Sequence, residues 1–228
     1  MADWKRAFVY TLPVMFGYVF LGIAFGILMA QSSYGVWWSL AASLFIYAGS
    51  MQFLMVQLLG AGAGLGLAAA MTLLLNSRHL FYGLSFIEKF RALGKARHYL
   101  IFSLTDETYS VFCSLAEGDC TPGLMTKIAL MDQFWWVLGS VLGGILGAHL
   151  PFDTTGIDFS MTALFVVIFI EQWLSAKSRL PAIIGLISSL VFLLLLGPDR
   201  FILPSLIVTV ALLLGARRPI EAQLGGAA

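Results

Sequence analysis

Long apolar runs, each close to the length of a membrane-spanning helix, recur along the whole chain and constrain its fold more than any other feature. The first extends from Phe8 to Ala30, and a helix needs about 20 such residues to cross the hydrocarbon core of a bilayer. Only 11% of the residues are charged, whereas soluble domains average about 25%. The sequence therefore predicts an all-α, polytopic helical membrane protein with about seven or eight hydrophobic segments.

Polar residues inside these runs indicate that some of the helices are discontinuous. The predicted segments occupy residues 8–30, 36–59, 65–75, 99–116, 128–150, 159–173, 180–196 and 201–216. The second is interrupted near its middle by the stretch Tyr47–Phe53, in which Tyr47 and Ser50 lie near one face at helical spacing. The segment at 99–116 holds many polar residues and fits either an ordinary span or a re-entrant piece.

Basic residues lie between the apolar runs, where they determine topology. The densest cluster consists of Lys89, Arg91, Lys95 and Arg97. Loops rich in lysine and arginine face the cytoplasm. The same rule places the N-terminus, with Lys5 and Arg6, in the cytoplasm.

This topology predicts a broken helix in the third segment. If 8–30 crosses outward and 36–59 crosses back, the chain must cross an even number of times between Gly64 and Lys89. That interval is too short for two full spans. We therefore expect a short, discontinuous hairpin with its turn at Asn76–His79, lining a cavity.

A weak internal sequence similarity, at an offset near 120 residues, predicts a repeat with halves at 1–118 and 119–218. Both halves belong to a single predicted membrane transport domain, 1–228. For example, Gln52-Phe53-Leu54 recurs as Gln172-Trp173-Leu174. The placement of the charges favours halves of the same orientation.

Arg78 and His79 are the leading candidates for a binding site, because two side chains that can carry positive charge directly follow an apolar run. A guanidinium binds a carboxylate through two hydrogen bonds, which a zwitterionic substrate would supply. The structural alternative is that Arg78 extends to the membrane surface and His79 bonds to a nearby carbonyl group. Gln52, Asn76 and Thr105 are neutral groups suited to an amino-acid backbone, although such residues also join helices to one another.

Asp106 and Glu107 are the second pair of candidates. Adjacent carboxyl groups in a segment of low dielectric raise each other's proton affinity, so one of them could bind the coupling proton or a substrate ammonium group. They could equally form structural ion pairs with Arg78 or with the basic loop at 89–97. A further pair, Asp132 and Gln133, is interpreted as lying at the membrane surface.

Several classes of protein lack support in the sequence. No nucleophile elbow, phosphate-binding loop or cluster of metal ligands is present, so we predict no enzymatic activity, no metal and no cofactor. The formal net charge of +1 predicts no nucleic-acid partner, since binding phosphates requires clustered basic residues.

Three motifs carry a resemblance to a known family. They are Tyr47-Ala48-Gly49-Ser50-Met51-Gln52-Phe53, Asn76-Ser77-Arg78-His79-Leu80-Phe81-Tyr82-Gly83 and Leu104-Thr105-Asp106-Glu107-Thr108. Their order and separation resemble the AzlC family, the large subunit of branched-chain amino-acid permeases. The resemblance implies export of branched-chain amino acids across the inner membrane of a bacterium, driven by an ion gradient, and a small partner subunit of the AzlD type.

Together these features predict a secondary transporter in a lipid bilayer that exports small hydrophobic amino acids, with the proton as the expected coupling ion. The predicted binding residues are Gln52, Asn76, Arg78, His79 and Thr105, and the predicted proton- or ammonium-binding residues are Asp106 and Glu107. A passive channel for small solutes and a membrane scaffold subunit remain the alternatives.

Overall fold

The structure is a computed structural model, and it describes residues 2–91, 93–149, 178–197 and 201–216, with isolated helical residues between 159 and 174. These residues form helices and no strand, as expected for an all-α fold. The chain divides into two compact units, residues 1–164 and 165–228, and each is described by itself. The predicted segment at 159–173 lies largely outside the described residues.

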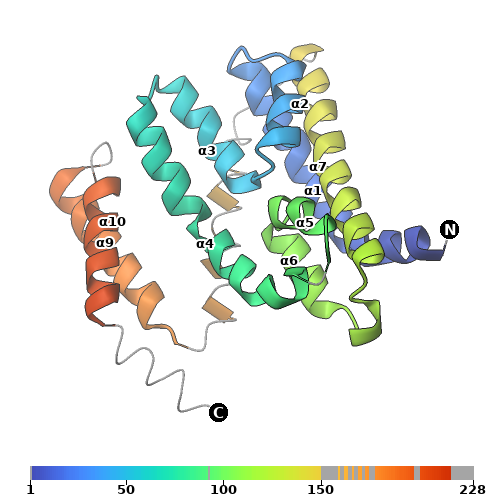
Figure 1. Cartoon of the computed structure of the whole chain (residues 1–228). Helices are drawn as coiled ribbons and strands as arrows, with labels where there is room; N and C mark the ends of the chain where they lie inside the picture. Colours follow the sequence, from blue (N-terminus) through green and yellow to red (C-terminus); the bar gives the residue numbers. More distant parts are fainter. Residues whose placement is uncertain are drawn as a thin grey trace. The chain divides into compact units, whose positions relative to one another are not determined.

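Two long helices, α1 (Ala2–Gln31) and α7 (Pro122–His149), are the main support of the first unit (Figure 1). Both are long and apolar enough to cross a membrane. They run parallel, because contacts advance together along both helices. Near their beginnings Lys127 bonds to Asp3 at 2.8 Å, and further along a Cβ on Gly147 would lie 2.9 Å from the Cα of Ile27.

Glycines allow the backbones of α1 and α7 to touch. A Cβ on Gly22 would lie 2.9 Å from the backbone nitrogen of Ser140, and one on Gly139 would lie 2.6 Å from the carbonyl oxygen of Val19. Gly26 and Gly143 meet the opposite backbone more closely still. Small residues at such spacing are how membrane helices pack most tightly, and here they fix the register between the two helices.

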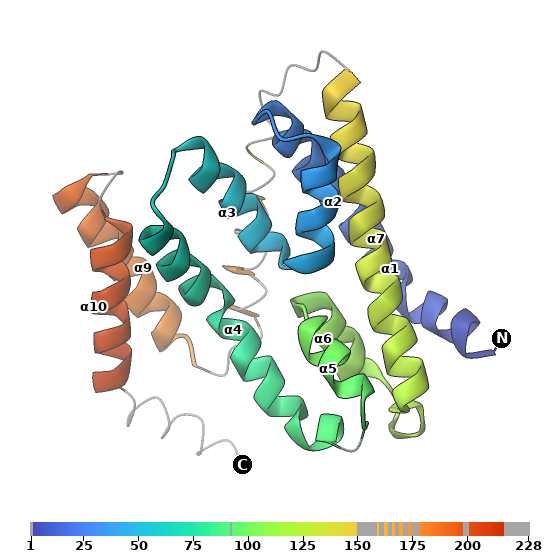
Figure 2. The same ribbon diagram turned by 45° about the horizontal axis from the view of Figure 1, so that its top comes forward.

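The second predicted segment is a helical hairpin rather than a span. Its arms are α2 (Val36–Phe45) and α3 (Gly49–Gly60), which meet near the middle of α7 (Figures 1 and 2). The amide nitrogen of Gln52 on α3 donates to the hydroxyl of Ser43 on α2 at 3.3 Å, across the hairpin. The polar interruption predicted at 47–53 is thus confirmed, and α3 returns towards the end at which α2 began.

The predicted break at Asn76–His79 is wrong. Helix α4 (Leu65–Arg91) continues through all of these residues for 27 residues, or about 40 Å at 1.5 Å per residue, and Arg78 is its central residue. The expectation failed because it counted 36–59 as a full crossing. Since α2 and α3 return to one end, a single crossing by α4 satisfies the same charge pattern.

A second hairpin resolves the open question about residues 99–116. Its arms are α5 (Ala96–Phe102) and α6 (Asp106–Ser114), which meet at Ser103–Thr105. This hairpin enters from the end of the unit opposite to the first one, as Figure 2 shows. A short 3-10 helix, η1 (Glu117–Asp119), then leads into α7.

The two hairpins are therefore parts of an inverted repeat. Helix α4 runs parallel to α6, because Tyr82 stacks on Tyr109 and Phe90 contacts Phe112. Helix α6 runs against α1, because Tyr18 bonds to Glu107 at the start of α6 whereas Tyr10, earlier in α1, bonds to Asp119 beyond its end. Helix α4 therefore opposes α1 in direction. In both copies a long helix is followed by a hairpin after the same interval: Val36 follows Gln31, and Ala96 follows Arg91.

In the described part of the second unit, two apolar helices, α9 (Leu180–Leu196) and α10 (Ile202–Gly215), contact each other. They confirm the segments predicted at 180–196 and 201–216. Gly197 ends α9 with φ of 75°, a conformation that glycine adopts without strain.

Candidate functional site

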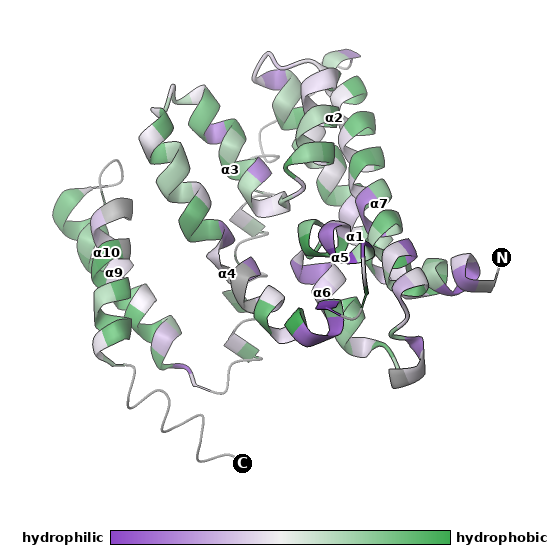
Figure 3. Cartoon of the chain, in the orientation of Figure 1, coloured by the Kyte–Doolittle hydropathy of each residue, from purple (hydrophilic) through white to green (hydrophobic). Residues whose placement is uncertain are grey.

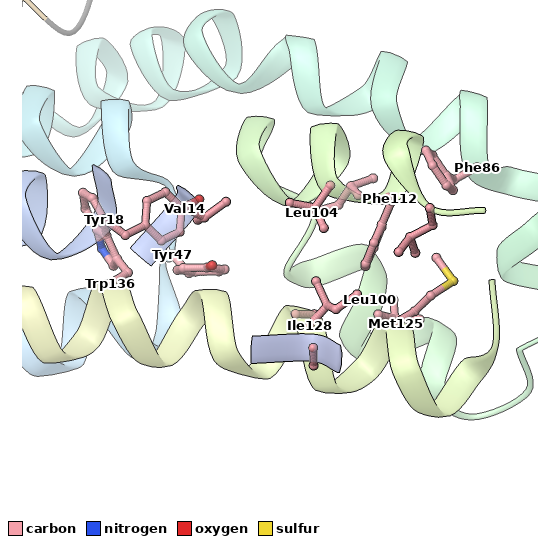
Figure 4. Close-up of a cluster of buried hydrophobic side chains, with 14 of the residues drawn as sticks. Val14, Tyr18, Tyr47, Phe86, Leu100, Leu104, Phe112, Met125, Ile128 and Trp136 are labelled. Atoms are coloured by element: carbon pink, nitrogen blue, oxygen red, sulfur yellow. The ribbon is translucent and has the colours of Figure 1, made fainter. Parts of the chain in front are cut away.

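The tips of the two hairpins meet between the middles of α1 and α7. Tyr47, at the first tip, lies with its ring centroid 6.4 Å from that of Tyr18 on α1 and 6.2 Å from that of Phe102, which ends α5. Tyr18 in turn packs edge-on against Trp136 of α7 at 5.3 Å. Figure 4 shows Tyr18, Tyr47 and Trp136 grouped beside α7, and this aromatic group marks the junction.

The first tip contains one residue with a strained backbone, Tyr47, and is held in place by the side-chain amide of Gln52. Tyr47 adopts φ of 43°, a left-handed conformation that costs a non-glycine residue about 1 kcal/mol or more. Gln52 is fully buried; its oxygen accepts from Trp136 Nε1 at 2.9 Å, and its nitrogen donates to Ser43. Both polar ends of this side chain are therefore engaged in joining α2, α3 and α7.

The second tip is capped and acidic. Thr105 is the N-cap of α6, and its hydroxyl accepts from the backbone N–H of Thr108 at 3.2 Å. The first turn of α6 then carries Asp106 and Glu107, where the positive end of the helix dipole favours negative charge. Both carboxylates are half-buried, and the hydroxyl of Tyr18 donates to Glu107 at 2.7 Å.

Asp132 is the residue that the sequence interpretation misplaced most. Predicted to lie at the membrane surface, it is fully buried, and one of its oxygens accepts from the Thr108 hydroxyl at 2.9 Å. The other oxygen makes no hydrogen bond within the described part of the chain. Helix α7 begins at Pro122, earlier than the predicted start at 128, so Asp132 lies well inside the helix.

Gln133, also predicted to lie at the surface, joins the two hairpins instead. Its oxygen accepts from the Tyr99 hydroxyl of α5 at 2.7 Å, and its nitrogen donates to the Leu44 carbonyl oxygen of α2 at 3.1 Å. The carbonyl groups in the last turn of a helix have no partners within it. Gln133 therefore stabilises the end of α2 while holding α5 in place.

The remaining predicted residues lie on α4. Asn76 and His79 are half-buried, and the His79 ring lies 5.9 Å from the ring of Tyr82, which stacks on Tyr109 of α6. Arg78 is at the centre of the helix, but its side chain is outside the described residues. Figure 3 shows hydrophilic residues in the middle of α4 and along α5 and α6.

The structure thus brings Gln52, Thr105 and Glu107 to the junction of the hairpin tips. It adds four residues that sequence reasoning did not select: Tyr18, Thr108, Asp132 and Trp136. Only Asp132 had a signal in the sequence, a carboxylate in a long apolar run. The others are ordinary residues of apolar helices, and only the packing gives them a role.

This combination of long apolar helices and two opposed hairpins defines a helical membrane protein with broken helices at its centre, an arrangement typical of secondary transporters. The chain matches the description "AzlC protein" over residues 13–150. It belongs to the AzlC family.

Relatives of known sequence support this membership. The chain is 40% identical over 223 residues to the "Branched-chain amino acid transport protein AzlC" of Bacillus subtilis, covering 96% of this chain and 87% of that protein. It is 36% identical over 219 residues to an "Uncharacterized membrane protein" of Helicobacter pylori, covering 95% and 96%. It is 28% identical over 177 residues to "Inner membrane protein YgaZ" of Escherichia coli, covering 74% and 72%. No solved structure matches the chain.

Proposed function

We propose that this protein exports branched-chain or similarly small hydrophobic amino acids across the bacterial inner membrane, driven by the proton gradient and together with a small AzlD-type subunit. Kinship with the Bacillus subtilis transport protein over nearly the whole chain supports the substrate class. The apolar helices and the membrane-protein relatives support the location.

The observation that carries the proposal is the meeting of two hairpin tips, from opposite ends, halfway along α1 and α7. Broken helices within inverted repeats place polar backbone and side chains at mid-membrane, where a transporter binds its substrate. Small rotations of one hairpin against the other would then open the junction to one side at a time. A passive pore has no need of such an arrangement.

In the proposed cycle Arg78 binds the substrate carboxylate, and Asp106 or Glu107 receives the ammonium group or the coupling proton. His79, Asn76, Gln52 and Thr105 complete the polar contacts. Arg78 is the central residue of α4, and Gln52, Thr105 and Glu107 belong to the junction of the tips. The buried side chains of Met51, Phe53 and Leu104, next to Gln52 and Thr105 in the sequence, would supply an apolar wall for a branched aliphatic substrate.

The topology that fits this function has the N-terminus in the cytoplasm. With α1 crossing outward, the first hairpin enters from the outside, α4 crosses inward, and the second hairpin enters from the cytoplasm. The basic cluster Lys89, Arg91, Lys95 and Arg97 then lies in the cytoplasm, beside the end of α4, as the positive-inside rule requires.

The test is an efflux measurement in bacteria with and without this chain and its small partner. After a load of leucine-containing peptide, cells with both proteins should hold less intracellular leucine, isoleucine, valine and methionine. A proton ionophore should abolish the difference; efflux that is indifferent to the ionophore supports a passive channel instead.

Arg78→Ala tests the binding role. Efflux should be lost while the protein still inserts into the membrane, since α4 tolerates alanine as a strong helix former. Ser77→Ala is the matched control on the same turn, because its hydroxyl donates to the Leu74 carbonyl oxygen of its own helix at 2.7 Å. Full efflux by Arg78→Ala would contradict the role given to Arg78.

A further inference from the structure

Asp132 and Glu107 are joined by an unbroken series of three hydroxyl groups, which we call the hydroxyl chain: Thr108, Thr105 and Tyr18. We propose that the two carboxyl groups share one proton through this chain, and that Asp132 is the buried partner in proton coupling. The inference rests on the proposed function and deepens it, since it assigns a role to a residue that neither the family resemblance nor the sequence pattern selected.

A hydrogen bond connects each pair of neighbouring groups in the hydroxyl chain. From the buried end, Thr108 donates to Asp132 at 2.9 Å, and Thr105 donates to Thr108 at 3.2 Å. Tyr18 and Thr105 are 2.6 Å apart, with either hydroxyl able to donate, and Tyr18 lies 2.7 Å from the Glu107 carboxylate. Every link is within hydrogen-bond range for O–H···O pairs or slightly beyond it.

The hydroxyl chain leads from a half-buried carboxylate to fully buried groups. Glu107 is half-buried, whereas Thr105 and Tyr18 are 7% and 4% exposed, and Thr108 and Asp132 are fully buried. A proton that reaches Glu107 would therefore be led into a region of low dielectric. Isolated polar groups are costly there, and these hydrogen bonds give each hydroxyl of the series a partner.

No positively charged group among the described residues faces Asp132. The ionisable groups that face it are Tyr18 of α1, Tyr47 of the first tip, Tyr99 of α5 and Glu107 of α6. None of them is a cation, and the described residues give Asp132 no salt bridge. A buried carboxylate without a counter-charge is strongly unfavourable, so a proton is the simplest group that can neutralise it.

The hydroxyl chain has two complete hydrogen-bond directions. In one, protonated Glu107 donates to Tyr18, Tyr18 to Thr105, Thr105 to Thr108, and Thr108 to ionised Asp132. In the other, protonated Asp132 donates to Thr108 and every bond is reversed, so that Tyr18 donates to ionised Glu107. Moving from the first to the second takes a proton from Glu107 and gives one to Asp132, while each hydroxyl gains one proton and loses one.

The two directions differ in where the single negative charge lies. When Asp132 is protonated, the negative charge lies on Glu107, at the second tip. When Glu107 is protonated, the negative charge lies on Asp132, in the middle of α7. Thr105 is both a link of the chain and the N-cap of α6, so the direction of its hydroxyl is tied to the tip itself. The shared proton would in this way couple protonation to the position of the second hairpin.

Asp132→Asn is the first test, in inside-out membrane vesicles from cells that express this chain with its small partner. Leucine movement is followed with radiolabel, and proton movement with a trapped pH dye. We expect leucine-driven proton movement to fall to the level of vesicles without the protein, while leucine-for-leucine exchange is retained and no longer varies with pH. Glu107→Gln should likewise lose leucine-driven proton movement.

Variants of the hydroxyl chain separate a relay from a structural contact. Thr108→Val has nearly the shape of threonine but no hydroxyl, and it should lose proton movement while keeping exchange. Thr108→Ser restores the hydroxyl and should restore proton movement. Tyr18→Phe should resemble Thr108→Val. Size-exclusion profiles in detergent confirm that each variant is folded.

The outcomes are distinct. Normal proton movement in Asp132→Asn or in Thr108→Val overturns the inference and leaves the proposed transport intact. Loss of exchange together with proton movement, in folded Asp132→Asn, also overturns it, because Asp132 would then bind the substrate ammonium group. Wild-type vesicles that move no branched-chain amino acid refute the proposed function itself.

Discussion

The two hairpins share one geometry but differ in chemistry. The first has no charged residue at its tip, and its residue Tyr47 takes a left-handed conformation between two helices. The second begins α6 with a capping threonine and two carboxylates. Both hairpins bond to Gln133 of α7, but their second arms bond to different residues: Gln52 of α3 to Trp136, and Thr108 of α6 to Asp132.

This difference suggests that the two hairpins have different roles at their junction. The first tip is fixed by neutral hydrogen bonds to buried partners, which suits a rigid wall of a binding site. The second tip is joined to protonatable groups, so its hydrogen bonds can be rearranged by one proton. In an inverted repeat the two halves need not move equally, and these contacts predict that the second hairpin is the moving one.

The largest effect is expected from Gly143→Ala, which would disturb the support common to both hairpins. The new Cβ would meet the backbone of Ile23, which has no flexible atoms to yield. Separating α1 from α7 moves Tyr18 away from both Trp136 and Asp132. We expect a loss of about 3 kcal/mol in unfolding free energy, seen as a lower Tm in detergent, and loss of all transport.

Gly66→Ala is the matched control, since nothing lies within 4 Å of its Cβ position on α4. Alanine favours a helix over glycine by about 1 kcal/mol, so this variant should be unchanged or slightly more stable. If Gly143→Ala has the Tm of the control, the close packing of α1 on α7 is not what holds the two tips together.

Gln52→Leu should weaken the first hairpin alone. The shape is similar, but the Trp136 N–H and the Ser43 hydroxyl lose their partner in a buried position. Leaving buried polar groups unsatisfied costs about 1–3 kcal/mol, which thermal unfolding would detect. Leucine-driven proton movement should keep its ratio to leucine movement, because the hydroxyl chain is untouched. A changed ratio would show that the first hairpin also takes part in proton coupling, contrary to the inference.

Much of this fold was predictable, because membrane helices and their polar interruptions leave strong patterns. The ends of α9 were predicted, and the break after Phe45 followed from the polar residues around Tyr47. The start of α6 also had a local signal, since Thr105 followed by Asp106 and Glu107 is typical of a capped helix N-terminus. Sequence reasoning left that signal unused.

The errors had physical causes. Polar residues at 76–79 do not require a break, because a helix already satisfies its own backbone and only the side chains need partners. The depth of Asp132 depended on the start of α7, which Pro122 marks as a favoured first-turn residue after Thr121. The hydroxyl chain could not be predicted from the sequence. It joins residues 18, 105, 107, 108 and 132, which only the three-dimensional fold brings together.

Tyr47→Phe should have a small effect on stability. The Tyr47 hydroxyl is buried and makes no hydrogen bond to the described residues, so removing it should leave the unfolding free energy unchanged or raise it by about 1 kcal/mol. The ring contacts with Tyr18 and Phe102 remain. If the variant is as stable as expected but binds leucine more weakly, the hydroxyl belongs to the substrate site. A marked loss of stability would mean that the first tip depends on an interaction of this hydroxyl.

The smallest effect is expected at Asp119, the last residue of η1, which follows the second hairpin. Its carboxylate bonds to Arg6 and accepts a hydrogen bond from the Tyr10 hydroxyl at 2.8 Å. The hydrogen bond from Arg6 holds the pKa of Asp119 below its usual range. Because the pKa is lower in the folded protein, the contribution of this pair to stability is present above the unfolded pKa of about 4. It is lost as the pH falls through the folded value.

Asp119→Asn should therefore lower Tm slightly at neutral pH, with the difference from wild type disappearing in strong acid. Between about pH 5 and pH 8 the carboxylate stays ionised, so the variant should leave the pH profile of leucine transport unchanged. The first hairpin has no comparable charged clamp among the described residues. A shifted pH profile in Asp119→Asn would place a proton-sensitive group outside the hydroxyl chain, and the contrast between the two tips would no longer account for coupling.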